Sequence, residues 1–195
     1  MIPAFPMTNY PHYMKSSRYV ALLRGINVGG KAPVAMSRLK ACFETAGCTQ
    51  VSTYINSGNV LFSDHRPAAQ LVECIEVAIA QEFHLGVPVV IRDAANLALL
   101  CQKIPLEWTN DALQKTDVLF LWDEVDRPSV LDMVAVNPGI EHALYLPGAL
   151  VWNIGRENVT RGGGVKLIKT DLYKHVTVRN INTVRKLNTL LTAAT

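Results

Sequence analysis

The chain has 195 residues, of which 49% are hydrophobic and 18% are charged, and its formal net charge at pH 7 is +3. This length suits one compact domain or two small ones, and the hydrophobic content excludes a chain that is disordered throughout. No apolar run approaches the roughly 20 residues that a membrane-spanning helix needs. Prolines and tyrosines interrupt residues 1–16, which therefore make a poor signal peptide; we expect a flexible leader with Met14 as an alternative start.

The first half of the chain, residues 17–104, has the pattern of a ferredoxin-like unit. Apolar runs predict strands at 18–27 and 87–93, and a hairpin turns at Asn56-Ser57-Gly58-Asn59. Helical spacing of apolar residues predicts helices at 36–47, 67–86 and 94–104. The order β-α-β-β-α-β, followed by one extra helix, belongs to the split β-α-β unit.

The second half, residues 116–195, repeats this order after a linker at 105–115. Strands are predicted at 116–124 and 176–179, with a hairpin about Pro147-Gly148 between them. Helical patterns predict helices at 127–136, 163–175 and 182–194.

Two pieces of the halves align with nearly constant offsets. Residues 57–62 align with 147–152, and residues 90–93 align with 177–180, at offsets of 90 and 87 residues. We interpret this as an internal duplication. The expected fold class is α+β, with two tandem ferredoxin-like halves that each precede an extra helix.

The four cysteines predict buried free thiols in a reducing, cytoplasmic compartment. They are Cys42, Cys48, Cys74 and Cys101, and none forms a C-x-x-C pair. Cys42 and Cys74 fall on the apolar faces of predicted helices. No histidine stands at metal-ligand spacing beside them, so we expect no metal site, and no cofactor is implied.

A glycine-rich loop follows the first predicted strand. Gly25 to Lys31 fits G-x-x-x-x-G-K, the phosphate loop of nucleotide hydrolases. Ala32, however, offers no hydroxyl to a magnesium ion, and Pro33 disfavours a helix that begins at the lysine. We set triphosphate hydrolysis aside. The glycines then serve either a turn with positive φ or an anion-binding loop beside Arg24.

The run "ALLRGINVGGKAPVAMSRLKACFETAGCTQVSTYINSGNVLF" resembles the opening of the bacterial domain-of-unknown-function family 1697, and "TVRNINTVRKL" resembles a second signature of that family. The resemblance implies an α+β fold with ferredoxin-like parts and no established reaction. Its signature residues fall on Arg24, Gly25, Asn27, Gly29, Gly30, Ser57, Gly58, Asn59, Arg179, Asn180 and Thr183. "TRGGGVK" departs from the expected pattern, and we expect its three glycines to loosen the loop that carries Arg161 and Lys166.

No catalytic motif is identified. The five histidines are scattered, and Ser57 precedes a glycine in a hairpin rather than in a G-x-S-x-G elbow. Asp123 and Glu124 are adjacent on a predicted strand, so their side chains would point to opposite faces. Whether the protein is an enzyme stays open.

These patterns favour a small anionic ligand, carrying phosphate or carboxylate, between the glycine loop and the Arg179-Asn180 corner. Junctions between strands and helices leave backbone donors free there. The candidate ligand-binding residues are Arg24, Asn27, Gly29, Gly30, Lys31, Ser57, Asn59, Arg179, Asn180 and Thr183.

Two alternatives stay open. Residues 156–195 hold eight lysines and arginines against two acidic residues, a net charge of +6, which could attract nucleic acid. The third interpretation is an interaction or structural protein that binds no small ligand. No membrane association is expected.

Overall fold

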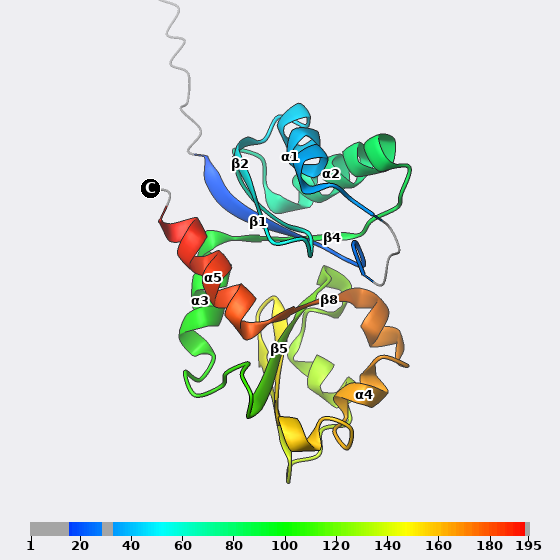
Figure 1. Cartoon of the computed structure of the whole chain (residues 1–195), viewed down its shortest axis with the longest axis vertical. Helices are drawn as coiled ribbons and strands as arrows, with labels where there is room; N and C mark the ends of the chain where they lie inside the picture. Colours follow the sequence, from blue (N-terminus) through cyan, green and yellow to red (C-terminus); the bar gives the residue numbers. More distant parts are fainter. Residues whose placement is uncertain (1–15, 29–32, 194–195) are drawn as a thin grey trace, which may run out of the picture.

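The computed structural model describes residues 16–28 and 33–193 (Figure 1). The leader, except for its last residue, and Gly29, Gly30 and Lys31 lie outside the described residues. Within the described part, the chain is an α+β protein with two four-stranded antiparallel sheets, as the order of predicted elements indicates.

The first sheet has the strand order β2-β3-β1-β4. Its strands are β1 (Ser17–Leu23), β2 (Thr49–Tyr54), β3 (Asn59–Asp64) and β4 (Val89–Asp93). Helices α1 (Met36–Thr45) and α2 (Ala68–Phe83) cover its outer face (Figure 1). Both helices are amphipathic, with Leu39 and Phe43 of α1 and Ile75 of α2 buried against the sheet.

The second sheet repeats that order as β6-β7-β5-β8. Its strands are β5 (Gln114–Leu121), β6 (Glu141–Leu146), β7 (Ala149–Gly155) and β8 (Val176–Asn180). The extra helices α3 (Ala94–Lys103) and α5 (Ile181–Thr192) follow β4 and β8 directly. Asp93 caps α3 by accepting from the Asn96 N–H, and Asn180 caps α5 by accepting from the Thr183 N–H.

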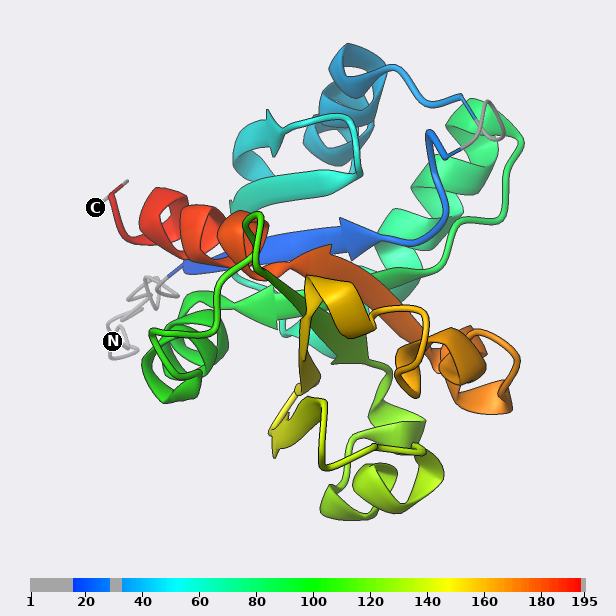
Figure 2. The ribbon, with the colours of Figure 1, turned by 60° about the horizontal axis from the view of Figure 1, so that its bottom comes forward.

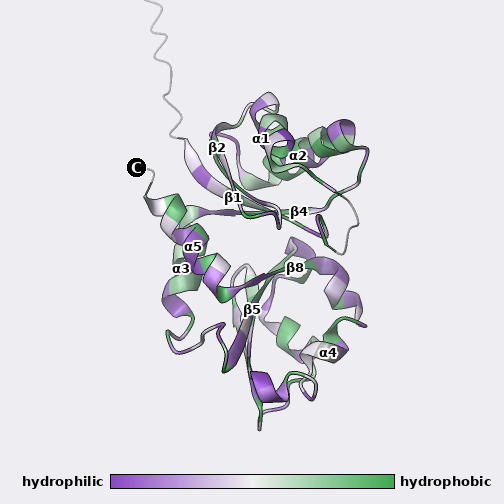
Figure 3. Cartoon of the chain, viewed as in Figure 1, coloured by the Kyte–Doolittle hydropathy of each residue, from purple (hydrophilic) through white to green (hydrophobic). Residues whose placement is uncertain are grey.

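The inner faces of the two sheets form one shared core. Val20 and Leu22 of β1 meet Val118 and Phe120 of β5 in a single buried cluster, which α3 and α5 complete. Both views show α3 and α5 side by side at one end of the two sheets (Figures 1 and 2). In Figure 3, α1, α2 and α5 each carry hydrophilic and hydrophobic residues, as expected for helices that cover a core on one side.

The outer face of the second sheet departs from the sequence prediction. The helix predicted at 127–136 is the 3₁₀ helix η2 (Pro128–Met133), after the 3₁₀ turn η1 (Asp123–Val125). The helix predicted at 163–175 is broken into α4 (Gly164–Leu167) and the 3₁₀ helix η4 (Asp171–His175), after η3 (Arg156–Asn158). The short helix predicted behind Pro128 is therefore present as a 3₁₀ helix. The continuous helix predicted at 163–175 is wrong: apolar spacing resembled a helix there, but the glycines at 162–164 withdraw helical stability.

The strand boundary before η1 is also shorter than predicted. β5 ends at Leu121, so Asp123 and Glu124 lie in a 3₁₀ turn and not on opposite faces of a strand. The prediction of a strand through Glu124 was wrong because the apolar run continues into Trp122, which caps the turn instead.

Candidate functional site

Arg179, on β8, connects the second half of the chain to the end of β1 and the β2–β3 hairpin of the first half. We call this region of contact between the halves the seam. The Arg179 side chain is buried, with 7% exposed, and its Nη2 donates to the carbonyls of Leu23, Ser57 and Gly58 at 2.9, 2.9 and 3.1 Å. Its Nε donates to the Asn59 side chain, and its Nη1 donates to Thr177 and to the Val178 carbonyl. All three nitrogens of the guanidinium therefore have protein acceptors.

Arg92 makes the reciprocal contact from the first half. Its Nη2 donates to the carbonyls of Leu121 and Gly148, which end β5 and form the turn of the β6–β7 hairpin. Gly148 corresponds to Gly58, and both have positive φ in equivalent hairpins. The match is incomplete, because Arg92 Nε is buried without a hydrogen-bond partner, and Ala149 stands at the position of Asn59.

Arg24 also belongs to this seam. Its Nε donates to the Val176 carbonyl at 3.0 Å and its Nη2 to the Tyr173 carbonyl at 2.9 Å. Its guanidinium carbon lies 5.6 Å from the centre of the Tyr173 ring. Arg24 and Arg179 thus both bind backbone carbonyls at this seam, with Arg179 on the carbonyl of Leu23, the residue before Arg24.

The remaining predicted residues hold the loops of this seam in place. Asn27 joins two loops, donating to the carbonyls of Val34 and Asn56 and accepting from the Val34 N–H. Asn59 donates to the Ser57 hydroxyl and to the Tyr54 carbonyl inside the hairpin. Asn180 and Thr183 form the cap of α5 described above. Gly29, Gly30 and Lys31 lie outside the described residues.

The electrostatics of the seam match this structural role. Burial lowers the pKa of Arg179 to about 10. A buried cation without an anionic neighbour is destabilised by desolvation, and hydrogen bonds to carbonyls offset part of that cost. The seam residues therefore fasten the two halves together through backbone carbonyls.

A second candidate site appears when equivalent positions of the two sheets are compared. In the first sheet, Tyr19 pairs across the ladder with Phe62, and in the second sheet Asp117 pairs with Trp152. On its other side, Tyr19 pairs with Asp93 and Asp117 pairs with Asn180, the residues that cap α3 and α5. Asp117 is therefore the counterpart of Tyr19.

Aromatic rings fill the outer layer of the first half at this place. Tyr19 stacks on Phe62 with ring centres 5.6 Å apart, and Phe43 of α1 meets Phe62 edge-on at 5.4 Å. The Tyr19 hydroxyl donates to the Arg66 carbonyl, so the ring is fixed at both ends.

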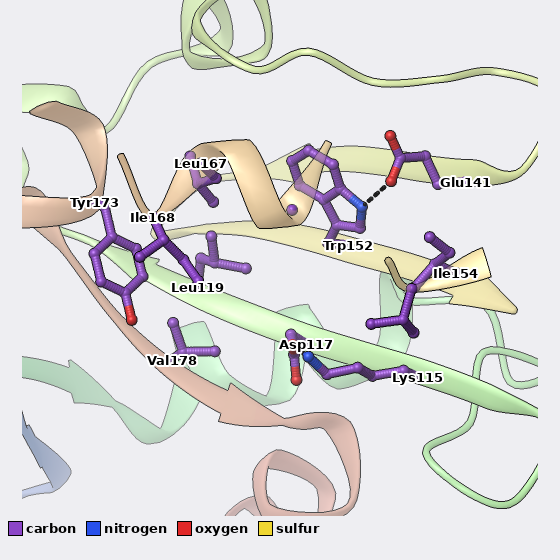
Figure 4. Close-up of a pocket in the computed structure, with 12 residues that line it drawn as sticks. Lys115, Asp117, Leu119, Glu141, Trp152, Ile154, Leu167, Ile168, Tyr173 and Val178 are labelled. Carbon is purple, nitrogen blue, oxygen red and sulfur yellow. Dashed lines mark hydrogen bonds and ion pairs between the residues drawn. The ribbon is translucent and has the colours of Figure 1, made fainter. Parts of the chain in front are cut away.

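The same place in the second half is hollow. A cavity of about 380 Å³ lies over β5, β7 and β8, where the sheet meets α4 and η4 (Figure 4). Its walls are mostly apolar, including Leu119, Trp152, Ile154, Leu167, Ile168 and Val178. The cavity exists because an aspartate replaces the tyrosine and a four-residue helix replaces a long one.

Glu141 secures the loop that borders this cavity. It is 1% exposed, and its carboxylate accepts from the N–H groups of Asn137 and Gly163 and from Trp152 Nε1. A Cβ at Gly163 would lie 1.8 Å from the Ala135 carbonyl oxygen, and one at Gly162 would lie 2.5 Å from Glu141 Oε2. These glycines permit close packing, which corrects the expectation that they loosen the loop.

Lys115 and Asp117 form an ion pair in one wall of the cavity. Lys115 Nζ and Asp117 Oδ2 are 3.0 Å apart on the outer face of β5, with side chains 39% and 24% exposed. Figure 4 shows this pair on one side of the cavity, Trp152 and Leu167 across from it, and Tyr173 beside Val178. The Tyr173 hydroxyl has no hydrogen bond to any residue that the structure describes.

Sequence reasoning missed Lys115, Asp117 and Tyr173. The available signal was the alignment of the halves: extending it to the first strand of each half would have set an aspartate against a buried tyrosine. The alternation Lys115-x-Asp117 also places two charges on one face of a strand, which is unusual for a covered face.

The cysteines are free thiols in the described residues. Cys42 and Cys48 are buried, whereas Cys74 and Cys101 are partly buried. Burial, with smaller contributions from Asp64, raises the pKa of the Cys48 thiol to about 12. In the part of the chain that the structure describes, no group of three or more His, Cys, Asp or Glu residues could hold a metal ion. No described helix is both long and apolar enough to cross a membrane.

Comparison with known proteins identifies a family and similar solved structures. A family described as "protein of unknown function (DUF1697)" matches residues 16–152. The structure of the conserved bacterial protein SP0830 from Streptococcus pneumoniae is similar, with 28% sequence identity and a TM-score of 0.79. The match covers 91% of this chain and 99% of that protein. No curated protein matches.

Proposed function

The chain belongs to the DUF1697 family of proteins of unknown function, and we propose that it is a small-molecule-binding protein whose site is the cavity over the outer face of the second sheet. The observation that carries this proposal is the difference between the halves. Equivalent strand positions hold a packed aromatic layer in the first half and a cavity of about 380 Å³ in the second.

The size and lining of the cavity support a ligand. Small-molecule sites have volumes of about 300–1,000 Å³ and combine apolar walls with a few polar groups. Here the walls include Trp152 and Leu167, and the polar groups are Lys115, Asp117 and the Tyr173 hydroxyl. A cavity at the lower end of that range suits a single small metabolite with a flat apolar part.

Titration with 1-anilinonaphthalene-8-sulfonate, whose fluorescence rises in apolar sites, tests this proposal. We expect saturable one-to-one binding by the wild-type protein and loss of binding in Val178→Trp, which fills the cavity from β8. Val77→Trp, on the exposed surface of α2, is the matched control and should bind as the wild type does. Equal binding by Val178→Trp would refute the proposal.

An anionic ligand at the seam is a second candidate, which one observation favours. Arg24 Nη1 donates to no acceptor among the described residues, and the glycine loop follows Arg24 directly. Arg179, the other arginine of the predicted anion site, already donates to six protein acceptors. Calorimetric titration with inorganic phosphate should show binding that Arg24→Ala removes; no heat from the wild type would exclude this site.

Nucleic-acid binding by the C-terminal region has less support from the geometry. Five of its eight cationic side chains have protein partners, namely Arg156, Arg161, Lys174, Arg179 and Arg185. Binding to single-stranded RNA should fall steeply with salt if this alternative holds.

We also infer that each half is a ferredoxin-like unit and that the two arose by duplication. The repeated strand order, the reciprocal Arg92 and Arg179 contacts and the matching helix caps support this inference. The proposed halves remain 17–104 and 116–195 with a linker at 105–115, although β5 already begins at Gln114. Buried free thiols at Cys42 and Cys48 support a cytoplasmic location as a further proposal.

A further inference from the structure

We propose that the ligand of this cavity is a zwitterionic aromatic α-amino acid, with its ring beside Trp152 and its charged groups on Lys115 and Asp117. This inference rests on the proposed function, since it names the chemical class that the same cavity takes.

The aromatic cluster of the first half indicates where the ring of the ligand would lie. There, Phe62 has the Tyr19 ring stacked on one side and the Phe43 ring at its edge. Trp152 occupies the position of Phe62 but has an aspartate as its cross-strand partner. A ligand ring in the cavity would restore the aromatic contact that the second half lacks, and such contacts add to the gain from burial.

The charges available in the lining define the ligand's head group. Glu141 is not available, because both of its oxygens already accept hydrogen bonds from N–H groups. Lys115 and Asp117 remain, one positive and one negative, 3.0 Å apart on the same face of β5. A single-charge ligand would satisfy one of them and repel the other, whereas a zwitterion with adjacent ammonium and carboxylate groups complements both.

Replacing the Lys115–Asp117 ion pair by contacts with a ligand costs the protein little stability. A partly exposed lysine–aspartate pair contributes little to stability, because water screens it and two side chains must be held in place. A bound amino acid would replace that one contact by two, with its carboxylate on Lys115 and its ammonium on Asp117. The Tyr173 hydroxyl, which has no described partner, offers a further polar contact.

Isothermal titration of the full chain with three related compounds tests the head group. L-phenylalanine carries both charges, phenethylamine only the ammonium and 3-phenylpropionate only the carboxylate. We expect L-phenylalanine to bind at least about tenfold more tightly than either analogue. Equal affinity for L-phenylalanine and one analogue would overturn the inference.

Two charge-neutralising variants assign the contacts. Lys115→Gln should weaken L-phenylalanine and 3-phenylpropionate about tenfold and leave phenethylamine unweakened; Asp117→Asn should do the opposite. Lys40→Gln is the matched control, because it removes an exposed lysine from another ion pair, with Glu44 on α1. It should change none of the three affinities. If both variants affect the two analogues alike, the assignment is wrong.

The two proposals fail in different ways. If 1-anilinonaphthalene-8-sulfonate binds in a manner that Val178→Trp abolishes but L-phenylalanine does not bind, the cavity is a site for another class of ligand and this inference is refuted. If neither compound binds, the proposed function itself is refuted.

Discussion

At the scale of single residues, Arg179 and Arg92 connect the two halves. Arg179 reaches three carbonyls of the first half, and Arg92 reaches two carbonyls of the second. A guanidinium suits this role because its donors point in fixed, divergent directions, which a lysine ammonium cannot reproduce. Arg179, a candidate ligand-binding residue in the sequence, therefore uses its Nη2 to bind carbonyls of the first half.

Arg179→Met should lower the free energy of unfolding by about 3 kcal/mol, because charge-assisted hydrogen bonds are lost and buried carbonyls lose a donor. Arg92→Met should lower it by only about 1 kcal/mol, since the buried Arg92 Nε has no partner to lose. Urea unfolding of both variants measures the difference. A smaller loss in Arg179→Met than in Arg92→Met would contradict this account of the seam.

Asp64 links stability to acid pH. It is 3% exposed and its carboxylate accepts from the Arg66 guanidinium and backbone N–H. Burial raises the pKa of this carboxyl, but the hydrogen bonds and charge of Arg66 together outweigh burial and lower it below 3.8. A lowered folded-state pKa stabilises the protein above the unfolded-state pKa, and this stabilisation is lost as pH falls through the folded-state value.

Asp64→Asn should therefore be less stable than the wild type at pH 7, and the difference should shrink as the pH falls below about 4. Urea titrations at a series of pH values between 7 and 2 give the two curves. Curves that stay parallel over that range would show that Asp64 has no such linkage.

At the scale of elements, the loop from η3 to η4 decides whether the second half has a cavity. Three consecutive glycines and Glu141 hold this loop against the sheet without a long helix. The first half has the opposite solution, since α1 and α2 place a full aromatic and aliphatic layer over the sheet. The same strand order thus supports a filled face in one half and an open one in the other.

Gly163→Ala should destabilise the protein strongly, by about 2–4 kcal/mol, because its Cβ would overlap the Ala135 carbonyl. Gly86→Ala is the matched control, since a Cβ there meets nothing within 4 Å, and its effect should stay within about 0.5 kcal/mol. Thermal unfolding monitored by circular dichroism compares the two. Equal melting temperatures would show that the loop moves freely to accept a side chain.

At the scale of the whole molecule, the halves share a core and cannot be separated without exposing it. Val20, Leu22, Val118 and Phe120 lie in one buried cluster that contains strands of both sheets. The arginine contacts at the seam run in both directions. The two halves in this arrangement should therefore unfold as one cooperative unit.

Unfolding should accordingly be a single transition for both halves. Trp122 and Trp152 lie in the second half, and Trp108 of the linker stacks on His142 of β6, so tryptophan fluorescence reports on the second half. Cys42 and Cys48, buried in the core of the first half, report on that half through their reaction with a thiol reagent. Tryptophan fluorescence and thiol labelling should share one urea midpoint; two separated midpoints would contradict the shared core.

The strands, the amphipathic helices α1, α2, α3 and α5 and the repeated order of elements could all be predicted from the sequence. Periodicity is a local property of the chain, so strands with β-branched residues and helices with apolar residues every third or fourth position are recognisable without the fold. The helix starts at Ala94 and Ile181 were also predictable, because Asp93 and Asn180 are good capping residues.

The roles of the polar residues, in contrast, depend on contacts that form only in the folded chain. The acceptors that Arg24 and Arg179 meet are backbone carbonyls of segments that lie far away from them in the sequence. The cavity likewise forms because no long helix covers the sheet at Asp117. The chain forms a tight loop there instead, in which glycines pack closely against Glu141 and Ala135. Such outcomes depend on contacts between distant segments, and a local pattern contains no information about which segments will meet.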